Sequence, residues 1–290
     1  MGNALIIGLS LGCVYGFVAV GFSLIYRTTG VMNFAQGASV MLGGMGAGYA
    51  GQAWGLPLWA AALIGIGFAL VGGLLLVLGV VLPLWKRGAS DFITMLGTLL
   101  FLVAAENVIL NTMGSDPRPV PRIDPQFTLQ VGGLRIDSQS LWIILVAIVV
   151  SVGLGVFIAR TSTGVAMRAV ATDQKVARLM GVNPAKMAVI TFTLAALIGG
   201  IGGVLVAPLQ FAAWNAAHVY NIKGFIAAVV GGVLDVRTAF LGGIVIGVLE
   251  AFIVTYASST YLDVLLLGVL LVLLLLRPSG IFGRAVAVKY

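Results

Sequence analysis

Apolar residues follow one another in long runs along the whole chain, with short polar stretches between them. Two runs, Leu141 to Ala159 and Tyr261 to Leu276, lie at or near the length of about 20 helical residues that crosses a bilayer core. The pattern predicts nine apolar membrane segments. They run over residues 4–25, 31–52, 57–82, 92–113, 140–159, 187–207, 222–234, 238–257 and 261–276.

Two of these segments are irregular. Asn33, Gln36 and a run of glycines interrupt the second, and the seventh has about thirteen residues, too few to cross a bilayer at about 1.5 Å per residue. We expect the seventh to be a half-helix or part of a bent helix. A merged reading treats 222–257 as a re-entrant pair and gives eight segments. The predicted fold class is therefore an all-α integral membrane protein of eight or nine segments, in one transmembrane domain over residues 1–290.

The composition agrees with a membrane protein. The chain is 60% hydrophobic and 9% charged, whereas about a quarter of the residues of an average soluble domain are charged. A soluble fold of this size could not hide so much apolar surface. The 40 glycines suit membrane helices, which pack through small residues. The single cysteine, Cys13, excludes a disulfide within the chain.

The basic residues orient the segments, because loops on the cytoplasmic side of a membrane carry an excess of Lys and Arg. With nine crossings, a cytoplasmic C-terminus and an outer N-terminus, twelve of the sixteen basic residues fall inside. The outer side then keeps only Arg118, Arg122, Arg135 and Lys223. The net charge of +7 is explained by this asymmetry, and no nucleic-acid partner is needed to account for it.

The outer loop, residues 114–139, is rich in proline over 116–122. Residues 127–136 then alternate in polarity around Gly132-Gly133, a turn signal that predicts a small hairpin.

The inner loop, residues 160–186, predicts a short amphipathic helix. Thr172 or Asp173 can cap its start, and Gly181 and Pro184 end it. The apolar face consists of Val176, Leu179 and Met180. The basic residues around it are Arg168, Lys175, Arg178 and Lys186. Such a helix can lie on the membrane surface or dock into a groove of a partner. The alternative is a basic linker held by anionic lipid headgroups.

Four stretches, in the same order over nearly the whole chain, resemble one known family. The inner loop contributes Gly164, Arg168-Ala169, Asp173, Ala177, Leu179 and Gly181-Val182, followed by the glycine-rich run 199–203. The others are 8–12 with Tyr15, Gly21, 23–26 and 29–35; Val230-Gly231-Gly232 with Gly242-Gly243, Gly247 and Glu250; and 277–283. With these residues the chain resembles the branched-chain amino acid permease family (LivH-type) of ATP-binding-cassette importers.

The resemblance implies a division of labour in a bacterial inner membrane. A second homologous permease, most simply in a heterodimer, two ATPase subunits and a periplasmic solute-binding protein are the expected partners. The chain has no G-x-x-x-x-G-K-[ST] phosphate loop, so no cofactor is expected on it, and ATP and Mg²⁺ are expected on the ATPases. Segment 160–186 would couple to them, with docking residues Arg168, Asp173, Arg178 and Gly181.

Polar residues within membrane segments are candidates for the substrate path, because burying them in lipid is costly. They are Asn33, Gln36, Glu106, Asn107, Asn111 and Glu250. Glycines around 33–37 can interrupt a helix that lines a cavity. The alternative role for all six is hydrogen bonding between helices.

One departure from the family pattern bears on the solute. The family commonly continues Asn-Phe-Ala with His-Gly and an acidic residue, whereas this chain reads Gln36-Gly37-Ala38. This change would alter the polar lining, so amino acids other than leucine, isoleucine and valine, short amides, urea and small carboxylates stay open.

Other functions have weaker signals. The serine-hydrolase pattern at 8–12 lacks a strand–turn–helix context, and Asn183-Pro184-Ala185 is a single copy of a water-channel motif that needs two. His218, beside Trp214 and Tyr220, is predicted at the outer surface, where the two aromatics would be interfacial anchors, and one histidine cannot build a metal cluster. The remaining alternative is an ion-coupled secondary transporter with Glu106 or Glu250 as its titrating group.

Overall fold

The computed structural model describes residues 2–123, 128–131, 134–256, 261–277 and 280–282, and these are almost entirely helical. The helices are α1 Gly2–Thr29, α2 Gln36–Ala53, α3 Leu58–Leu76, a π-helical turn Val77–Val81, α4 Leu82–Lys86, α5 Asp91–Met113, α6 Ser138–Arg160, α7 Ser162–Thr172, α8 Gln174–Leu179, α9 Pro184–Gln210, α10 Ala216–Gly231, α11 Val236–Tyr256 and α12 Leu262–Leu276. Two strands, β1 Thr128–Val131 and β2 Leu134–Asp137, form an antiparallel pair in which Thr128 faces Asp137. The outer-loop sequence predicts a hairpin over 127–136, of which residues 127, 132 and 133 lie outside the described residues.

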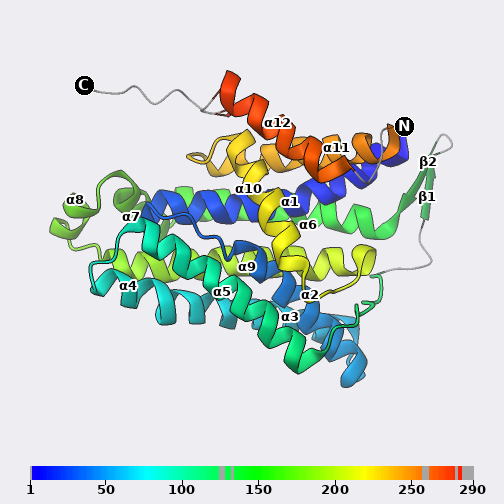
Figure 1. Ribbon diagram of the computed structural model, residues 1–290, viewed down its shortest axis with the longest axis horizontal. Helices are drawn as coiled ribbons and strands as arrows, with labels where there is room; N and C mark the ends of the chain where they lie inside the picture. Colours follow the sequence, from blue (N-terminus) through cyan, green and yellow to red (C-terminus); the bar gives the residue numbers. More distant parts are fainter. Residues whose placement is uncertain (1, 124–127, 132–133, 257–260, 278–279, 283–290) are drawn as a thin grey trace.

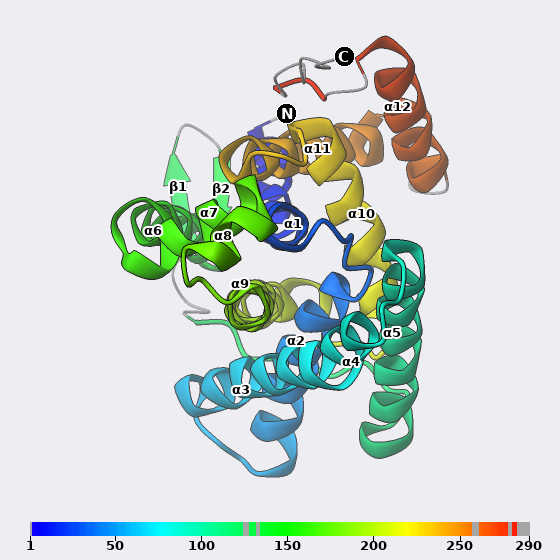
Figure 2. The ribbon, with the colours of Figure 1, turned by 90° about the vertical axis from the view of Figure 1, so that its left-hand side faces the viewer.

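Among the described residues, six helices are long and apolar enough to cross a membrane, and α12 is a shorter apolar helix. The spanning helices lie roughly along the long axis of the molecule (Figure 1). Seen along that axis, α1 and α9 lie at the centre, and α5, α10 and α12 form one side (Figure 2). This arrangement is compatible with the predicted eight or nine segments, because α2 and α10 complete the set as shorter helices.

Two helices follow the irregular segments of the sequence. The chain leaves α1 at Thr29, runs without helical structure through 30–35 and starts α2 at Gln36, so the break predicted around Asn33 is present. The predicted short segment 222–234 is α10, which has 16 residues and runs across the long helices in both views (Figures 1 and 2). With 16 residues, α10 is shorter than a typical full crossing of about 20 residues.

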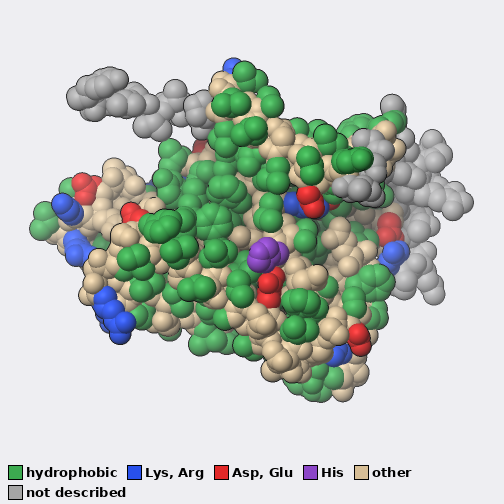
Figure 3. All heavy atoms as spheres, in the orientation of Figure 1, with side chains coloured by type: hydrophobic (Ala, Val, Ile, Leu, Met, Phe, Trp, Pro, Cys, Tyr) green, Lys and Arg blue, Asp and Glu red, His purple; other side chains and the backbone are tan. Residues whose placement is uncertain are grey.

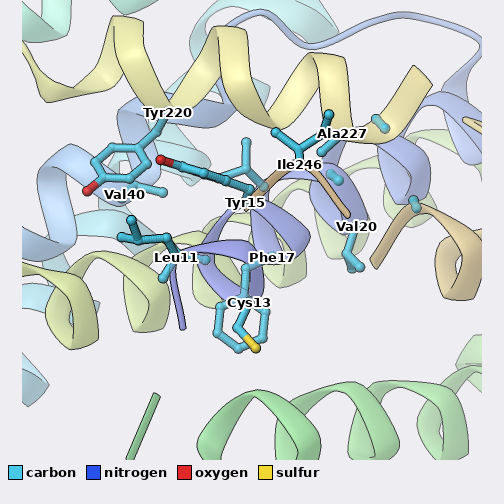
Figure 4. Packing of buried hydrophobic residues seen from close by; sticks show 14 of the residues in the cluster. Leu11, Cys13, Tyr15, Phe17, Val20, Val40, Tyr220, Ala227 and Ile246 are labelled. Atoms are coloured by element: carbon cyan, nitrogen blue, oxygen red, sulfur yellow. The ribbon is translucent and has the colours of Figure 1, made fainter. Parts of the chain in front are cut away.

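Glycine brings α1 against α11. A Cβ at Gly243 would overlap the backbone of Gly16, and one at Gly247 would overlap that of Gly12. Small residues let membrane helices approach this closely, which maximises van der Waals contact where no hydrophobic driving force exists between helices. The rest of the α1 interface is a cluster of apolar side chains that includes Phe17, shown with its neighbours in Figure 4.

The third predicted segment ended at residue 82, but the helix continues to Lys86 through a π-helical turn at Val77–Val81. Pro83 explains the turn, because it has no N–H to donate to the carbonyl four residues earlier. The helical register shifts by one residue there, and the N–H of Leu82 reaches back to the carbonyl of Val77.

Basic side chains gather at the end of the molecule where α4, α7 and α8 lie (Figure 3). At the opposite end, Arg118 is tied to α2 and α5: its guanidinium donates to Gln52 and to the carbonyl of Met113, and lies 5.0 Å from the centre of the Tyr49 ring. The prediction that Lys223 lies on the outer side is wrong. Lys223 is buried within α10 and pairs with Glu250, because an acidic partner 27 residues away compensates its charge.

Candidate functional site

The break between α1 and α2 is held by its own polar side chains. Asn33 and Gln36, 2% and 1% exposed, are joined by an Asn33 Nδ2 to Gln36 Oε1 hydrogen bond of 3.4 Å. Asn33 Oδ1 accepts from the N–H of Ala35 at 3.1 Å, and Gln36 Nε2 donates to the carbonyl of Ala195 in α9 at 2.9 Å. The two amides therefore satisfy backbone groups that an interrupted membrane helix leaves open.

Other elements hold the same break from outside. Thr98 of α5 accepts the N–H of Phe34 at 2.9 Å, and Asn221 of α10 accepts the N–H of Gly37 at 3.1 Å. The half-buried ring of Phe34 packs against Phe225 of α10, with ring centres 5.6 Å apart. Phe34 is thus partly exposed, whereas the two amides are buried.

Glu106 of α5 meets the start of α10. Its Oε1 accepts the backbone N–H of His218 at 3.2 Å, and its Oε2 lies 3.3 Å from the Nδ1 of the same histidine. The Glu106 side chain is 10% exposed and that of His218 is 55% exposed. A carboxylate near the first turn of a helix is favoured by the helix dipole. The prediction that His218 lies at the surface is confirmed, although it is paired with Glu106; the prediction of Tyr220 as an interfacial anchor is wrong, because Tyr220 is buried.

Asn107 and Asn111 are exposed on α5, one turn apart. Each amide donates to its own helix at 2.8 Å, Asn107 to the carbonyl of Val103 and Asn111 to that of Asn107. They are not joined to the Glu106–His218 pair by any hydrogen bond among the described residues.

The second intramembrane ion pair lies deeper in the bundle. Lys223 Nζ of α10 is 2.6 Å from Glu250 Oε1 of α11, and it also donates to the hydroxyl of Tyr15 in α1 at 3.3 Å. Tyr15 and Tyr220 lie beside each other at this junction, with ring centres 6.2 Å apart (Figure 4). Glu250 is therefore tied to a lysine in the wall between three helices and is 6% exposed.

The inner loop folds as α7 and α8, with Asp173 between them. Its carboxylate accepts the N–H of Lys175 at 2.7 Å and of Val176 at 3.0 Å, so Asp173, and not Thr172, caps α8. These hydrogen bonds, with Val176 the larger cause, hold the pKa of Asp173 below its ordinary value. Gln174 ties α8 to the end of α1 through the carbonyls of residues 28 and 29, at 3.4 Å each.

The tip of this segment exposes apolar side chains. Leu179 is 89% exposed and Met180 is 77% exposed, at the far end of the molecule in Figure 1. Gly181 follows with a φ of +83°, the left-handed conformation that ends a helix, as predicted. Arg168 and Arg178 are exposed; Arg168 donates to the carbonyl of Ala159 at 3.3 Å. We call residues 162–182, which comprise α7, α8 and this tip, the coupling segment.

The structure therefore divides the predicted path residues into separate groups. Asn33 and Gln36 anchor the break, Glu250 pairs with Lys223, Glu106 pairs with His218, and the two asparagines face outward on α5. Sequence reasoning missed Lys223 and His218 as partners, although a basic residue inside an apolar segment was a signal for the first. Among the described residues, no three His, Cys, Asp or Glu side chains are grouped to hold a metal ion.

The chain is similar in sequence to known transport proteins. Residues 4–275 match the family described as branched-chain amino acid transport system / permease component. The high-affinity branched-chain amino acid transport system permease protein BraD of Pseudomonas aeruginosa is 30% identical over 292 residues, 97% of this chain and 95% of that protein.

Two LivH proteins are also similar. The high-affinity branched-chain amino acid transport system permease protein LivH of Escherichia coli K12 is 28% identical, over 96% of this chain and 94% of its own. The probable branched-chain amino acid transport permease protein LivH of Methanocaldococcus jannaschii is 29% identical, over 92% and 87%. The multi-pass helical fold and the match over nearly its whole length show that this chain belongs to the branched-chain amino acid transport permease family.

Proposed function

We propose that this chain is the membrane-spanning subunit of an ATP-driven importer for branched-chain amino acids or similar small polar solutes. The observation that carries the proposal is the coupling segment. It extends from the bundle at the basic end of the molecule, with Leu179 and Met180 almost fully exposed on a short capped helix. Exposed apolar side chains rimmed by charged residues are typical of a protein interaction site.

The partner at this site is an ATPase subunit in the proposal. The chain has no phosphate-binding loop, so ATP and Mg²⁺ would be bound by two such subunits. Arg168 and Arg178 would surround the apolar contact with positive charge, and Gly181 would end the helix that carries it. The basic end of the molecule then faces the cytoplasm of a bacterial inner membrane, with the N-terminus outside and the C-terminus inside. A second homologous permease and a periplasmic binding protein complete the assembly.

The proposed solute class follows the names of the relatives. The change at Gln36-Gly37-Ala38, which left other solutes open, is a weaker argument against that class once the burial of these residues is considered. Gln36 and Ala38, where the chain differs from the family pattern, are 1% and 2% exposed and packed inside the bundle. The change therefore bears on how the break is anchored more directly than on what a passing solute meets. Leucine, isoleucine and valine are the first solutes to test, followed by other small amino acids.

The test is to express the chain with its candidate ATPase subunits and a tagged permease. A Leu179→Asp, Met180→Asp double variant should reduce co-purification of the ATPase and ATP-dependent uptake into vesicles, because it charges the docking surface. The control is Lys86→Gln, an exchange on α4 at the same basic end but outside the coupling segment. ATPase binding and uptake that are unchanged in the double variant would contradict the coupling role.

The same vesicles address the ion-coupled alternative. Uptake driven by a proton or sodium gradient in the absence of ATPase subunits would refute the importer proposal. Loss of uptake when ATP is withheld, with an ion gradient still present, is the expected result.

A further inference from the structure

The side of the bundle formed by α5 and α10 carries an ionisable pair at membrane depth. Glu106 lies seven residues before the end of α5 at Met113, which is about 10 Å along the helix axis. His218, its partner, keeps a side chain that is 55% exposed. A buried carboxylate with an exposed histidine beside it is costly against hydrocarbon at this depth, and such residues face a bundle interior or a water-filled space. The side of the bundle formed by α5 and α10 is therefore better suited to contact with water or another subunit than with lipid.

The open face of α10 continues from this pair as a stripe. His218, Ile222 and Phe225 follow at helical spacing, with Ile222 48% exposed and Phe225 half-buried. Phe34, at the break before α2, packs on Phe225 and is tied to Thr98 of α5. Thr98 and Glu106 are eight residues apart on α5, so the stripe extends over about 12 Å of the axis of that helix. We call His218, Ile222, Phe225 and Phe34 the α10 strip. It lies on the side of the molecule seen in Figure 3, where the histidine of the chain is visible beside an acidic side chain.

The other side of α5 is different and provides an internal comparison. Between α3 and α5 lies a groove of about 620 Å³ that is almost wholly apolar, and Val108, 59% exposed, lines it. Val108 lies at nearly the same depth as Glu106. The same helix thus presents an apolar surface suited to lipid on one side and an ionisable pair on the other.

The chemistry of the α10 strip has two parts. An ionised carboxylate only accepts hydrogen bonds, so beside an ionised Glu106 the Nδ1 of His218 would be the donor. This fixes the ring and leaves its Nε2 edge for another hydrogen-bonding group. Ile222 and Phe225 then offer an aliphatic and an aromatic surface within two turns of the same helix. A polar group next to a short apolar surface complements a small solute with a hydrogen-bonding head and an aliphatic side chain.

We propose that the α10 strip is this subunit's wall of the solute path, with His218 binding the polar head of an amino acid and Ile222 and Phe225 contacting its side chain. Glu106 is a positioning residue that orients the imidazole. The opposite wall comes from the second permease, so the site is incomplete in one chain. This assignment rests on the proposed function, and it moves the path from Asn33 and Gln36 to residues of α10.

The experiment uses cysteine accessibility in the complete transporter. Cys13, the only native cysteine, is 4% exposed and is first replaced by Ala. Single cysteines are then placed at His218, Ile222 and Val108, and vesicles are treated from either side with a charged, membrane-impermeant methanethiosulfonate. We expect rapid labelling at the two α10 positions and little at Val108. Leucine with the binding protein should slow labelling at both α10 positions.

The labelling of Ile222→Cys and the uptake by two His218 variants test the assignment independently. Ile222→Cys leaves the Glu106–His218 pair intact, so it still tests the path if His218→Cys fails to assemble. His218→Ala should raise the leucine concentration for half-maximal uptake by about tenfold, the loss expected for one hydrogen bond to a polar solute group. His218→Gln should restore part of it.

Labelling of Ile222→Cys no faster than Val108→Cys, or labelling that leucine does not slow, would overturn the assignment. ATP-driven uptake by the Cys13→Ala parent is measured in the same vesicles. If that uptake is present and the labelling pattern is absent, only the α10 strip is refuted; if ATP-driven uptake is absent, the proposed function fails first.

Discussion

The buried pair of Lys223 and Glu250 gives the sharpest prediction about what holds α10 in place. The Nζ and Oε1 atoms are 2.6 Å apart, and the side chains are 10% and 8% exposed. At an effective dielectric constant of about 20 this separation corresponds to roughly 6 kcal/mol of Coulomb attraction. Desolvation of two ions costs several kcal/mol each, so the net contribution of the intact pair is close to zero.

Removing one partner has a very different effect, because the other charge stays buried without compensation. Such truncations cost about 3–5 kcal/mol. Lys223→Met and Glu250→Gln should therefore each lower the free energy of unfolding by about that amount. The double variant Lys223→Met, Glu250→Leu should lie within about 2 kcal/mol of the parent, because an apolar pair of similar volume replaces the ions.

The assay is unfolding of the purified protein by SDS in mixed micelles, followed by circular dichroism and by tryptophan fluorescence. The matched control is the surface pair Arg122–Asp137, separated by 3.1 Å with side chains 45% and 31% exposed. Asp137→Asn should change stability by less than about 1 kcal/mol, since exposed ion pairs contribute little. A double variant at Lys223 and Glu250 as unstable as the worse single variant would refute this reasoning. So would single variants as stable as the parent.

Three other predictions concern the anchoring of helices. Gln36→Leu should destabilise the fold by about 1–3 kcal/mol in the same assay, because the carbonyl of Ala195 loses its buried donor; a changed solute preference at unchanged stability would instead favour a role in the path. Gly243→Leu should prevent α1 and α11 from meeting and abolish detergent-stable protein, whereas Gly155→Leu, at a position with open space around it, should be tolerated; equal yields would contradict the packing argument. Asp173→Ala should lower amide-exchange protection in α8, and Asp173→Asn should largely keep it. Because the folded pKa of Asp173 is lowered, its capping contribution is present above the ordinary 3.8 and should be lost as the pH falls through the folded value, which exchange measured against pH would detect.

The sequence predicted the parts of the fold that depend on local chemistry. Long apolar runs predicted the spanning helices, because a chain in lipid must form all its backbone hydrogen bonds internally. The alternating residues of the outer loop predicted the two strands, and Asp173 with Gly181 predicted the ends of α8. Each of these signals lies within a few residues of the structure it determines. The end of the third segment was missed because an apolar pattern does not show how a π-helical turn accommodates Pro83.

The path candidates were harder to predict because polar residues in membrane helices have several possible partners. Asn33 and Gln36 were correctly identified as belonging to a break, but the amide of Gln36 also donates to the carbonyl of Ala195, 159 residues further along the chain. Nothing in the local pattern separates an amide that anchors a helix from one that meets a solute. The partners of Glu106 and Glu250 lie 112 and 27 residues away, and only the packing of α10 brings them together.

The separate polar groups share one structural role, because each attaches α10 to another helix. Besides its apolar packing against the bundle, this 16-residue helix has polar attachments that include Glu106 at its start, Asn221 to the α2 break, and Lys223 to Glu250. These attachments fix the helix against α1, α2, α5 and α11. His218 and Ile222, which are among the exposed residues of this helix, are then presented on a rigid support. Rigid presentation is what a solute site between two subunits requires, and it follows that variants weakening the Lys223–Glu250 pair should also slow uptake by displacing the α10 strip.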